Sequence, residues 1–186
     1  MKYSKSIEIP RWTEISEKYK HYISVADKLK SIRLPKEELL YLESVISENF
    51  KINVGTTPII NDALLFFTLG NKNRGIHVDG DSLDRSHLCK WGLNIPILNC
   101  ANAEMKWYNG VYDLTVVNNP IGLTHLTINW KEGPYEIESL VIDKPVLVHI
   151  DTPHTVINYS SDIRIMLSVR FRPSLMLYKI KRQSFK

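Results

Sequence analysis

The stretch PVLVHIDTPHTVINYSSDIRIMLSVRF, residues 145–171, sets the fold class. It holds three short apolar or alternating runs, and turn-forming residues such as TP and SSD separate them. Runs of this length between such breakers are typical of β-strands. In the last run, Arg164, Met166, Ser168 and Arg170 alternate with aliphatic side chains, so they share one face of a strand. We therefore predict consecutive strands, the last with polar groups on one face.

The same pattern of short apolar runs separated by turn-forming residues extends back to residue 51. Runs such as ALLFFTL, WGLNIPIL, MKWY, LTVV, THLTINW and YEIESLVI are separated by breakers such as NKNRG, EGP and DKP. Strands at this spacing predict an all-β sandwich or barrel. We expect one domain, residues 1–186, with a β core over residues 51–172 and a basic C-terminal tail over residues 173–186.

The first 50 residues have a helical pattern. The segment RWTEISEKYKHYISVADKLKSI, residues 11–32, spaces its apolar residues three and four apart. The segment PKEELLYLESVISENF, residues 35–50, begins with a proline and two glutamates, which suit a helix N-terminus. We expect both helices to pack on the outside of the β core.

Composition narrows the class of protein. The chain of 186 residues is 44% hydrophobic and 24% charged, as in ordinary globular proteins. Its start lacks an apolar leader, and no apolar run approaches the roughly 20 residues of a membrane helix. Cys89 and Cys100 are expected to be reduced thiols, so we predict a cytoplasmic protein without a membrane partner. The basic tail could contact a phosphate backbone, but it is more typical of a solvated terminus, and we do not expect nucleic acid as a partner.

The stretch GIHVDG, residues 75–80, offers two metal ligands. His77 and Asp79 lie two residues apart, so on a strand both would point to the same face. An iron site of the two-histidine, one-carboxylate type needs such a pair and one more histidine. His-x-Asp is a common tripeptide, and the alternative is a turn in which Asp79 caps a bend before Gly80.

Three later histidines could complete the site. His154 follows Pro153 at the head of a strand and suits the role best. His149 lies inside an apolar strand, where we expect it to pack or form a hydrogen bond. His125 follows the turn NPIG and is expected near the surface.

Arg164 lies ten residues after His154. We predict that YSSD forms a hairpin turn that brings the Arg164 strand beside the His154 strand. If this face points inward, the buried guanidinium needs an anionic partner, and a carboxylate held by Arg164 with help from Ser168 would supply it. The alternative is an outward, solvated face.

In order and spacing, His77-x-Asp79, His154 and Arg164 resemble the 2-oxoglutarate/Fe(II)-dependent dioxygenase superfamily. The resemblance covers about residues 57–172. The layout is similar to short phage and marine members grouped loosely with aspartyl/asparaginyl β-hydroxylase-like proteins. Aspartyl β-hydroxylases proper lack the carboxylate ligand that Asp79 would provide, so the chain departs from that subfamily.

The resemblance implies a double-stranded β-helix, the jelly-roll or cupin-like fold, with the N-terminal helices packed outside. It implies that Fe(II) is held by His77, Asp79 and His154. It also implies that the distal carboxylate of 2-oxoglutarate pairs with Arg164, with Ser168 as a helper and Asn94 facing the cosubstrate. Whether Arg170 also contacts the cosubstrate stays open.

The implied activity is that of a non-haem iron dioxygenase, a hydroxylase acting on a peptidyl, amino-acid or small-molecule substrate. Two alternatives remain at this point. One is a cupin-like metal protein that binds no 2-oxoglutarate, for which Arg164 is the discriminating residue. The other is a non-enzymatic jelly-roll domain, in which His77, Asp79 and His154 would not converge.

Overall fold

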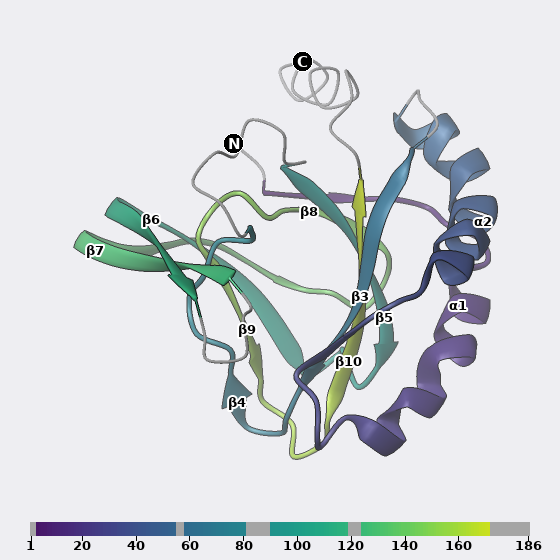
Figure 1. Cartoon of the computed structure of the whole chain (residues 1–186), viewed down its shortest axis with the longest axis horizontal. Helices are drawn as coiled ribbons and strands as arrows, with labels where there is room; N and C mark the ends of the chain where they lie inside the picture. Colours follow the sequence, from purple (N-terminus) through teal and green to yellow (C-terminus); the bar gives the residue numbers. More distant parts are fainter. Residues whose placement is uncertain (1–2, 55–57, 81–89, 119–123, 172–186) are drawn as a thin grey trace.

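The computed structural model describes residues 3–54, 58–80, 90–118 and 124–171. Two antiparallel sheets face each other (Figure 1). The larger sheet has the order β1-β8-β5-β10-β3-β2 and the smaller one the order β4-β9-β6-β7. The larger sheet consists of β1 (Ser4–Ser6), β2 (Ser31–Arg33), β3 (Ile60–Thr68), β5 (Trp91–Leu98), β8 (Val146–His149) and β10 (Arg164–Phe171). The smaller sheet consists of β4 (Lys72–Asn73), β6 (Ala103–Asn118), β7 (Thr124–Val141) and β9 (His154–Asn158). This is a jelly-roll arrangement, and the predicted mainly-β fold class is confirmed.

The N-terminal helices cover the outer face of the larger sheet (Figure 1). They are α1 (Trp12–Tyr19), the 3₁₀ helix η1 (Lys20–Val25) and α2 (Lys36–Val54). One buried cluster joins their apolar side chains, such as Ile15 and Leu42, to outward-facing residues of the sheet, such as Leu65 and Leu167. The helices therefore pack outside the β core, as predicted.

The predicted helix over residues 11–32 is wrong in its second half. The α-helix ends at Tyr19, and residues 31–33 form strand β2. There Ile32 pairs with Leu65 and extends the edge of the larger sheet. Tertiary pairing of this kind overrides a helical spacing of apolar residues, because the sheet edge supplies the hydrogen bonds that the helix would otherwise provide. In the part of the chain that the structure describes, no helix combines the length and the apolar character that crossing a membrane requires.

A second core fills the space between the two sheets. It contains Met105 and Trp107 from β6, Val148 from β8 and Met166 from β10. The neighbours of Met166 along β10, Ile165 and Leu167, belong to the outer cluster beneath the helices. The alternation predicted for this strand is confirmed, and its polar face points between the sheets.

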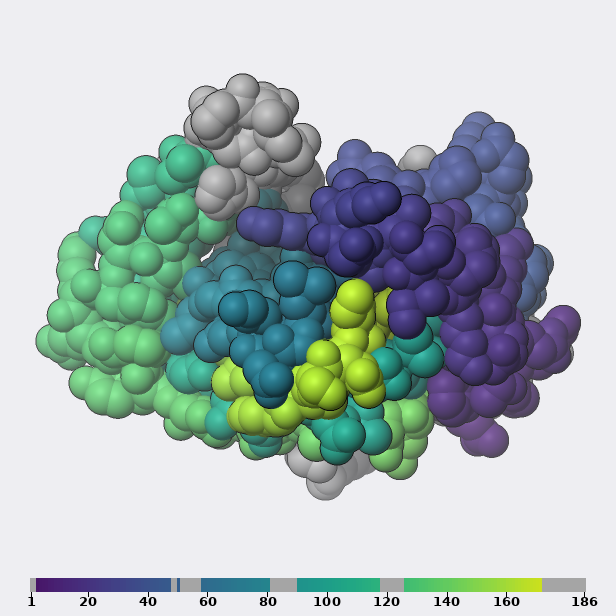
Figure 2. Space-filling view, turned by 90° about the horizontal axis from the view of Figure 1, so that it is seen from below, coloured from purple at the N-terminus to yellow at the C-terminus, as the bar shows by residue number. Residues whose placement is uncertain are grey.

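The predicted hairpin between the His154 and Arg164 strands is wrong. β9 lies in the smaller sheet and pairs with β4 and β6, whereas β10 lies in the larger sheet between β3 and β5. The YSSD connection therefore crosses from one sheet to the other. Seen from below, this connection (yellow) lies at the surface beside the segment around β4 (blue-green), where Asn71 N donates to Ser160 O at 2.8 Å (Figure 2).

Asn158 anchors this crossing. Its side chain is 1% exposed. Its amide nitrogen donates to the carbonyl oxygens of Thr68 at 3.1 Å and Asp162 at 2.7 Å. Its amide oxygen accepts from Ser160 N at 3.2 Å. One buried amide thus joins the end of β3, the end of β9 and the turn between the sheets.

Asn158→Ala is expected to lower the free energy of unfolding by about 3 kcal/mol, because it leaves buried backbone carbonyls without donors. Urea unfolding measures this change. The matched control is Asn129→Ala, where the amide of an exposed asparagine donates to Thr115 Oγ1. We expect the control to change stability by less than about 0.5 kcal/mol. Equal effects of the two variants would contradict the anchoring role.

The strands β6 and β7 are longer than predicted. MKWY and LTVV merge into β6, and THLTINW and YEIESLVI merge into β7. The breaker EGP lies within β7, next to register shifts between Asn109 and Tyr112 of the partner strand. A bulge of this kind absorbs extra residues without ending a strand, which is why the breaker does not become a turn.

Candidate active site

His77, Asp79 and His154 come together between the sheets. His77 lies after β4, outside a named strand, and forms an isolated bridge with His154 through two backbone hydrogen bonds of 2.9 Å. Asp79 Oδ1 lies 3.5 Å from His77 Nε2 and 3.7 Å from His154 Nε2. The three ligand atoms all lie within 4.8 Å of one another. Two imidazoles and one carboxylate at this spacing could hold a divalent metal ion on one face of the ion.

The backbone sets the orientation of both imidazole rings. His154 Nδ1 lies 2.8 Å from Thr152 O, and His77 Nδ1 lies 3.1 Å from Gly75 O. A carbonyl oxygen only accepts hydrogen bonds, so Nδ1 carries the proton in each neutral ring. The lone pair then lies on Nε2, the atom that faces Asp79. Hydrogen bonds of this kind hold metal-binding histidines in the correct tautomer.

Arg170 holds the other oxygen of the carboxylate. Its Nη2 donates to Asp79 Oδ2 in a partly buried ion pair. Gly92, opposite Arg170 on β5, leaves room for this guanidinium, because a Cβ at residue 92 would overlap Nη1. Arg170 thus positions Asp79 and leaves Oδ1 facing the histidines, while its own Nη1 is buried without a hydrogen-bond partner.

Burial keeps His154 neutral. Its side chain is enclosed between the sheets, which, together with the nearby His77, lowers its pKa from 6.5 to about 4. A neutral imidazole is the form that binds metal.

The metal-free protein should lose stability in acid because of this residue. Unfolded His154 titrates near 6.5 and the folded residue near 4, so the unfolded state binds more protons between these values. We expect the free energy of unfolding to fall by up to about 3 kcal/mol from pH 7 to pH 4 on this account. Urea unfolding of metal-free wild type and His154→Gln across this range tests it. The same pH dependence in both proteins would contradict the assignment.

Arg164 is buried in the same space without an acidic partner. It is 3% exposed, and its Nε has no hydrogen-bond partner. Among the described residues, no carboxylate lies within 4 Å of it. Burial lowers its pKa, and the Cys100 thiol is the neighbour that favours its charged form. A buried guanidinium in this state has an uncompensated charge, so the site is suited to an anion.

Thr68 adds a second unsatisfied group at the same place. It pairs with Arg164 across β3 and β10, and its Oγ1 is buried without a partner. Together the two side chains offer hydroxyl and guanidinium donors to one ligand. Sequence analysis missed Thr68 because it ends the apolar run ALLFFTL, and only the pairing of β3 with β10 places it beside Arg164.

Ser168 and Asn94 also lie on the inner face. They pair across β10 and β5, and Ser168 Oγ donates to Asn94 Oδ1 at 2.6 Å. Both are buried. Each therefore has a protein partner, in contrast to Arg164 and Thr68.

His149 does not join the cluster. His149 Nδ1 lies 2.8 Å from Thr152 Oγ1, and its ring contacts the edge of Trp91. This confirms the predicted packing role. For His125, the structure describes only the backbone, which pairs with Val117.

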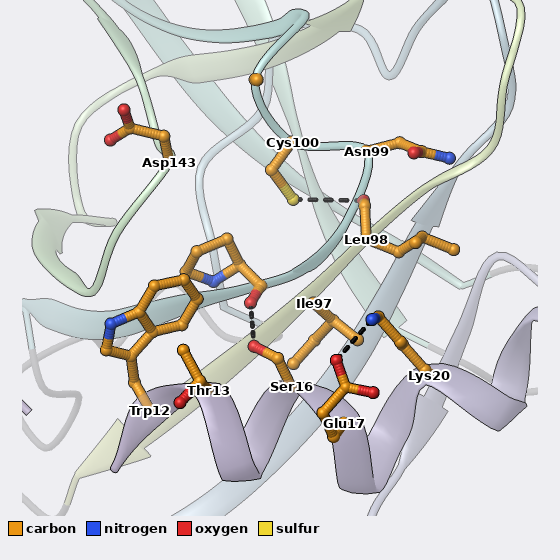
Figure 3. A pocket seen from close by; sticks show the side chains of 12 residues that line it. Trp12, Thr13, Ser16, Glu17, Lys20, Ile97, Leu98, Asn99, Cys100 and Asp143 are labelled. Carbon is orange, nitrogen blue, oxygen red and sulfur yellow. Dashed lines mark hydrogen bonds and ion pairs between the residues drawn. The ribbon is translucent and has the colours of Figure 1, made fainter. Parts of the chain in front are cut away.

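A surface pocket of about 260 Å³ lies elsewhere, between α1 and the end of β5 (Figure 3). Its wall includes Trp12, and Ser16 donates across it to Pro96 O at 2.5 Å. The candidate metal ligands and Arg164 do not line it. Cys100 lines the pocket while its thiol donates to Leu98 O, so this residue separates the surface from the interior beside Arg164.

Comparisons with known proteins show the fold. No known protein-family model matches the sequence, and no curated protein matches it. Among solved structures, the non-haem monooxygenase ThoJ in its apo form has a TM-score of 0.50 and 12% identity, over 90% of this chain and 71% of that one. At this identity the likeness shows a shared jelly-roll fold.

Two further solved structures resemble the chain more distantly. A prolyl-4-hydroxylase from Pseudomonas putida has a TM-score of 0.49 and 9% identity, over 92% of this chain and 91% of that one. The non-haem alpha-ketoglutarate-dependent carbocyclase SnoK from nogalamycin biosynthesis has a TM-score of 0.47 and 14% identity, over 82% and 69%.

Proposed function

We propose that this protein is an Fe(II)- and 2-oxoglutarate-dependent oxygenase. The observation that carries the proposal is the presence of two complementary groups of donors in one interior. His77, Asp79 and His154 form a candidate metal site. Arg164 Nε and Thr68 Oγ1 are buried donors without a hydrogen-bond partner in the protein. A metal ligand that is also an anion would satisfy both groups at once.

2-Oxoglutarate has the required chemistry. Its 2-oxo acid end can chelate a metal ion, and its distal carboxylate can accept hydrogen bonds from a guanidinium and a hydroxyl. With bound Fe(II), it would supply the oxidation in which one atom of O₂ enters succinate and the other enters the product. The three protein ligands leave coordination positions free for such chemistry.

The protein's own residues have separate tasks in this proposal. Nε2 of each histidine and Oδ1 of Asp79 would bind Fe(II), and Arg170 would keep Asp79 in place. Arg164 would hold the distal carboxylate with Thr68 beside it, while Ser168 and Asn94 would form the adjoining wall. Trp107 and Met166, both buried, would exclude water from the interior.

The proposed reaction is hydroxylation of a peptidyl, amino-acid or small-molecule substrate. A cupin-like metal protein would need the metal ligands but would give no reason for a buried, unpaired Arg164. A non-enzymatic jelly roll would explain neither group. The presence of Asp79 speaks against a close relation to aspartyl β-hydroxylases. Cys100, a free and buried thiol, suits a reducing compartment, and we propose the cytoplasm.

An anaerobic titration tests the proposal. Metal-free protein receives Fe(II) and then 2-oxoglutarate while visible absorption is recorded. We expect a weak charge-transfer band that requires both additions, followed by succinate formation when O₂ is admitted. Iron binding without the band would favour the cupin-like alternative. The absence of iron binding would leave only the non-enzymatic one.

A further inference from the structure

We propose that Arg74 recognises an anionic group on the primary substrate. This inference rests on the proposed function and names the substrate class of the same site. Arg74 follows β4, three residues before His77, and its backbone N donates to Val156 O of β9 at 3.2 Å. It therefore belongs to the edge of the smaller sheet, next to the candidate metal ligands.

The side chain of Arg74 reaches across to the larger sheet. Its guanidinium lies over the ring of Phe66 on β3, 4.9 Å from the centroid. Its Nη2 donates to Lys30 O, just before β2, at 3.4 Å. Stacking on an aromatic ring holds the planar group in one orientation while its edge stays available for a ligand.

Few of the donors on Arg74 are used by the protein. A guanidinium has five N–H donors, and the contact with Lys30 O is one long hydrogen bond of 3.4 Å. Among the described residues, no carboxylate lies within 4 Å of Arg74. Its pKa is lowered by burial and by Arg164, and raised by Asp79. Arg74 therefore lies within electrostatic reach of both the anion site and the metal site.

The charges of the site favour an anionic substrate. Arg74 and Arg170 lie near the carboxylate of Asp79, and Arg164 lies near Arg74, so among the described residues three guanidinium groups share this interior with one carboxylate. Nearby Asp62 is paired with Arg33 at 3.2 Å and does not offset them. Fe(II) adds two positive charges and 2-oxoglutarate removes two. Two positive charges remain after both have bound, and a negative group on the substrate would reduce this excess.

The roles of the other two arginines leave Arg74 for the substrate. Arg170 is engaged with Asp79, and Arg164 would hold the distal carboxylate of 2-oxoglutarate. The opposite end of that cosubstrate would lie on the metal. Arg74 is thus a third cationic group beside the site without an assigned anion, and a carboxylate or a phosphate on the substrate fits its bidentate geometry.

The test uses probes that differ in charge. Anaerobic protein with Fe(II) and 2-oxoglutarate bound is titrated calorimetrically with benzoate, phenyl phosphate and neutral benzamide. We expect at least one anionic probe to bind about tenfold more tightly than benzamide, in line with one charge-assisted contact. The stronger of the two anions would identify the group as a carboxylate or a phosphate.

Arg74→Gln should remove this preference and change the affinities for Fe(II) and 2-oxoglutarate far less. Arg74→Lys should restore part of it. The matched control is Lys72→Gln, an exposed cation two residues away on β4, which should leave it intact. The inference is overturned if wild type does not prefer an anionic probe or if Arg74→Gln keeps the preference. It is also overturned if the main effect of Arg74→Gln is weaker binding of 2-oxoglutarate. If wild type forms no charge-transfer band before any probe is added, the proposed function itself fails.

Discussion

His154→Ala will weaken Fe(II) binding by about 100-fold or more and abolish succinate formation. Loss of an outer hydrogen bond at a metal site already costs about 10- to 100-fold in affinity, and this change removes a ligand itself. His154 is also the least exposed of the three candidate ligands, so another side chain cannot easily replace it. Equilibrium titration with Fe(II) under anaerobic conditions measures the change.

The matched control for this variant is His149→Ala. His149 lies five residues earlier, packs on Trp91 and is not one of the three clustered residues. We expect it to cost some stability but to leave iron affinity within about twofold, since it contributes no ligand. Retained iron affinity in His154→Ala, at unchanged secondary structure, would show that the metal site is elsewhere or absent.

Arg164→Met will have two opposite effects. It will weaken 2-oxoglutarate binding by about 100-fold, because the distal carboxylate loses a buried charge-assisted partner. It will also stabilise the protein without ligands, by about 1–4 kcal/mol, because an apolar side chain of similar length replaces an unpaired buried charge. Titration with 2-oxoglutarate and urea unfolding measure the two effects on the same sample.

Two further variants sharpen this result. Thr68→Val keeps the shape of the side chain and removes the unsatisfied hydroxyl, so we expect about tenfold weaker 2-oxoglutarate binding without loss of stability. Arg11→Met replaces an arginine whose side chain is 61% exposed beside α1 and should leave cosubstrate binding unchanged. If Arg164→Met destabilises the ligand-free protein, the guanidinium has a stabilising partner, and the anion site is contradicted.

Much of the fold follows from patterns that act over a few residues. The alternation in IRIMLSVRF places Arg164 and Ser168 on one face of β10, because a strand turns successive side chains to opposite faces. The apolar spacing of residues 35–50 produces α2 for the same kind of local reason. The spacing of His77 and Asp79, with His154 after a proline, predicts three candidate ligands, and the structure brings these three side chains together.

The partners of these segments were not visible in such patterns. The turn after Asn158 has the composition of a hairpin, yet the chain crosses there from one sheet to the other. The buried side-chain amide of Asn158 donates a hydrogen bond to the carbonyl of Thr68, 90 residues earlier. Ile32 lies in a segment with a helical spacing of apolar residues, but it forms a strand because it pairs with Leu65. The crossing after Asn158 and the strand at Ile32 both depend on hydrogen bonds with backbone groups that are distant in the sequence.

The sequence by itself therefore determined which residues share a face of a strand, where α2 and most strands lie, and which side chains are candidates for a metal site. Tertiary structure alone decided that Thr68 stands beside Arg164 and that Arg74 lies over Phe66. The physical reason is that side-chain alternation is a property of each strand, whereas register and sheet order depend on the burial and hydrogen bonding of the whole chain.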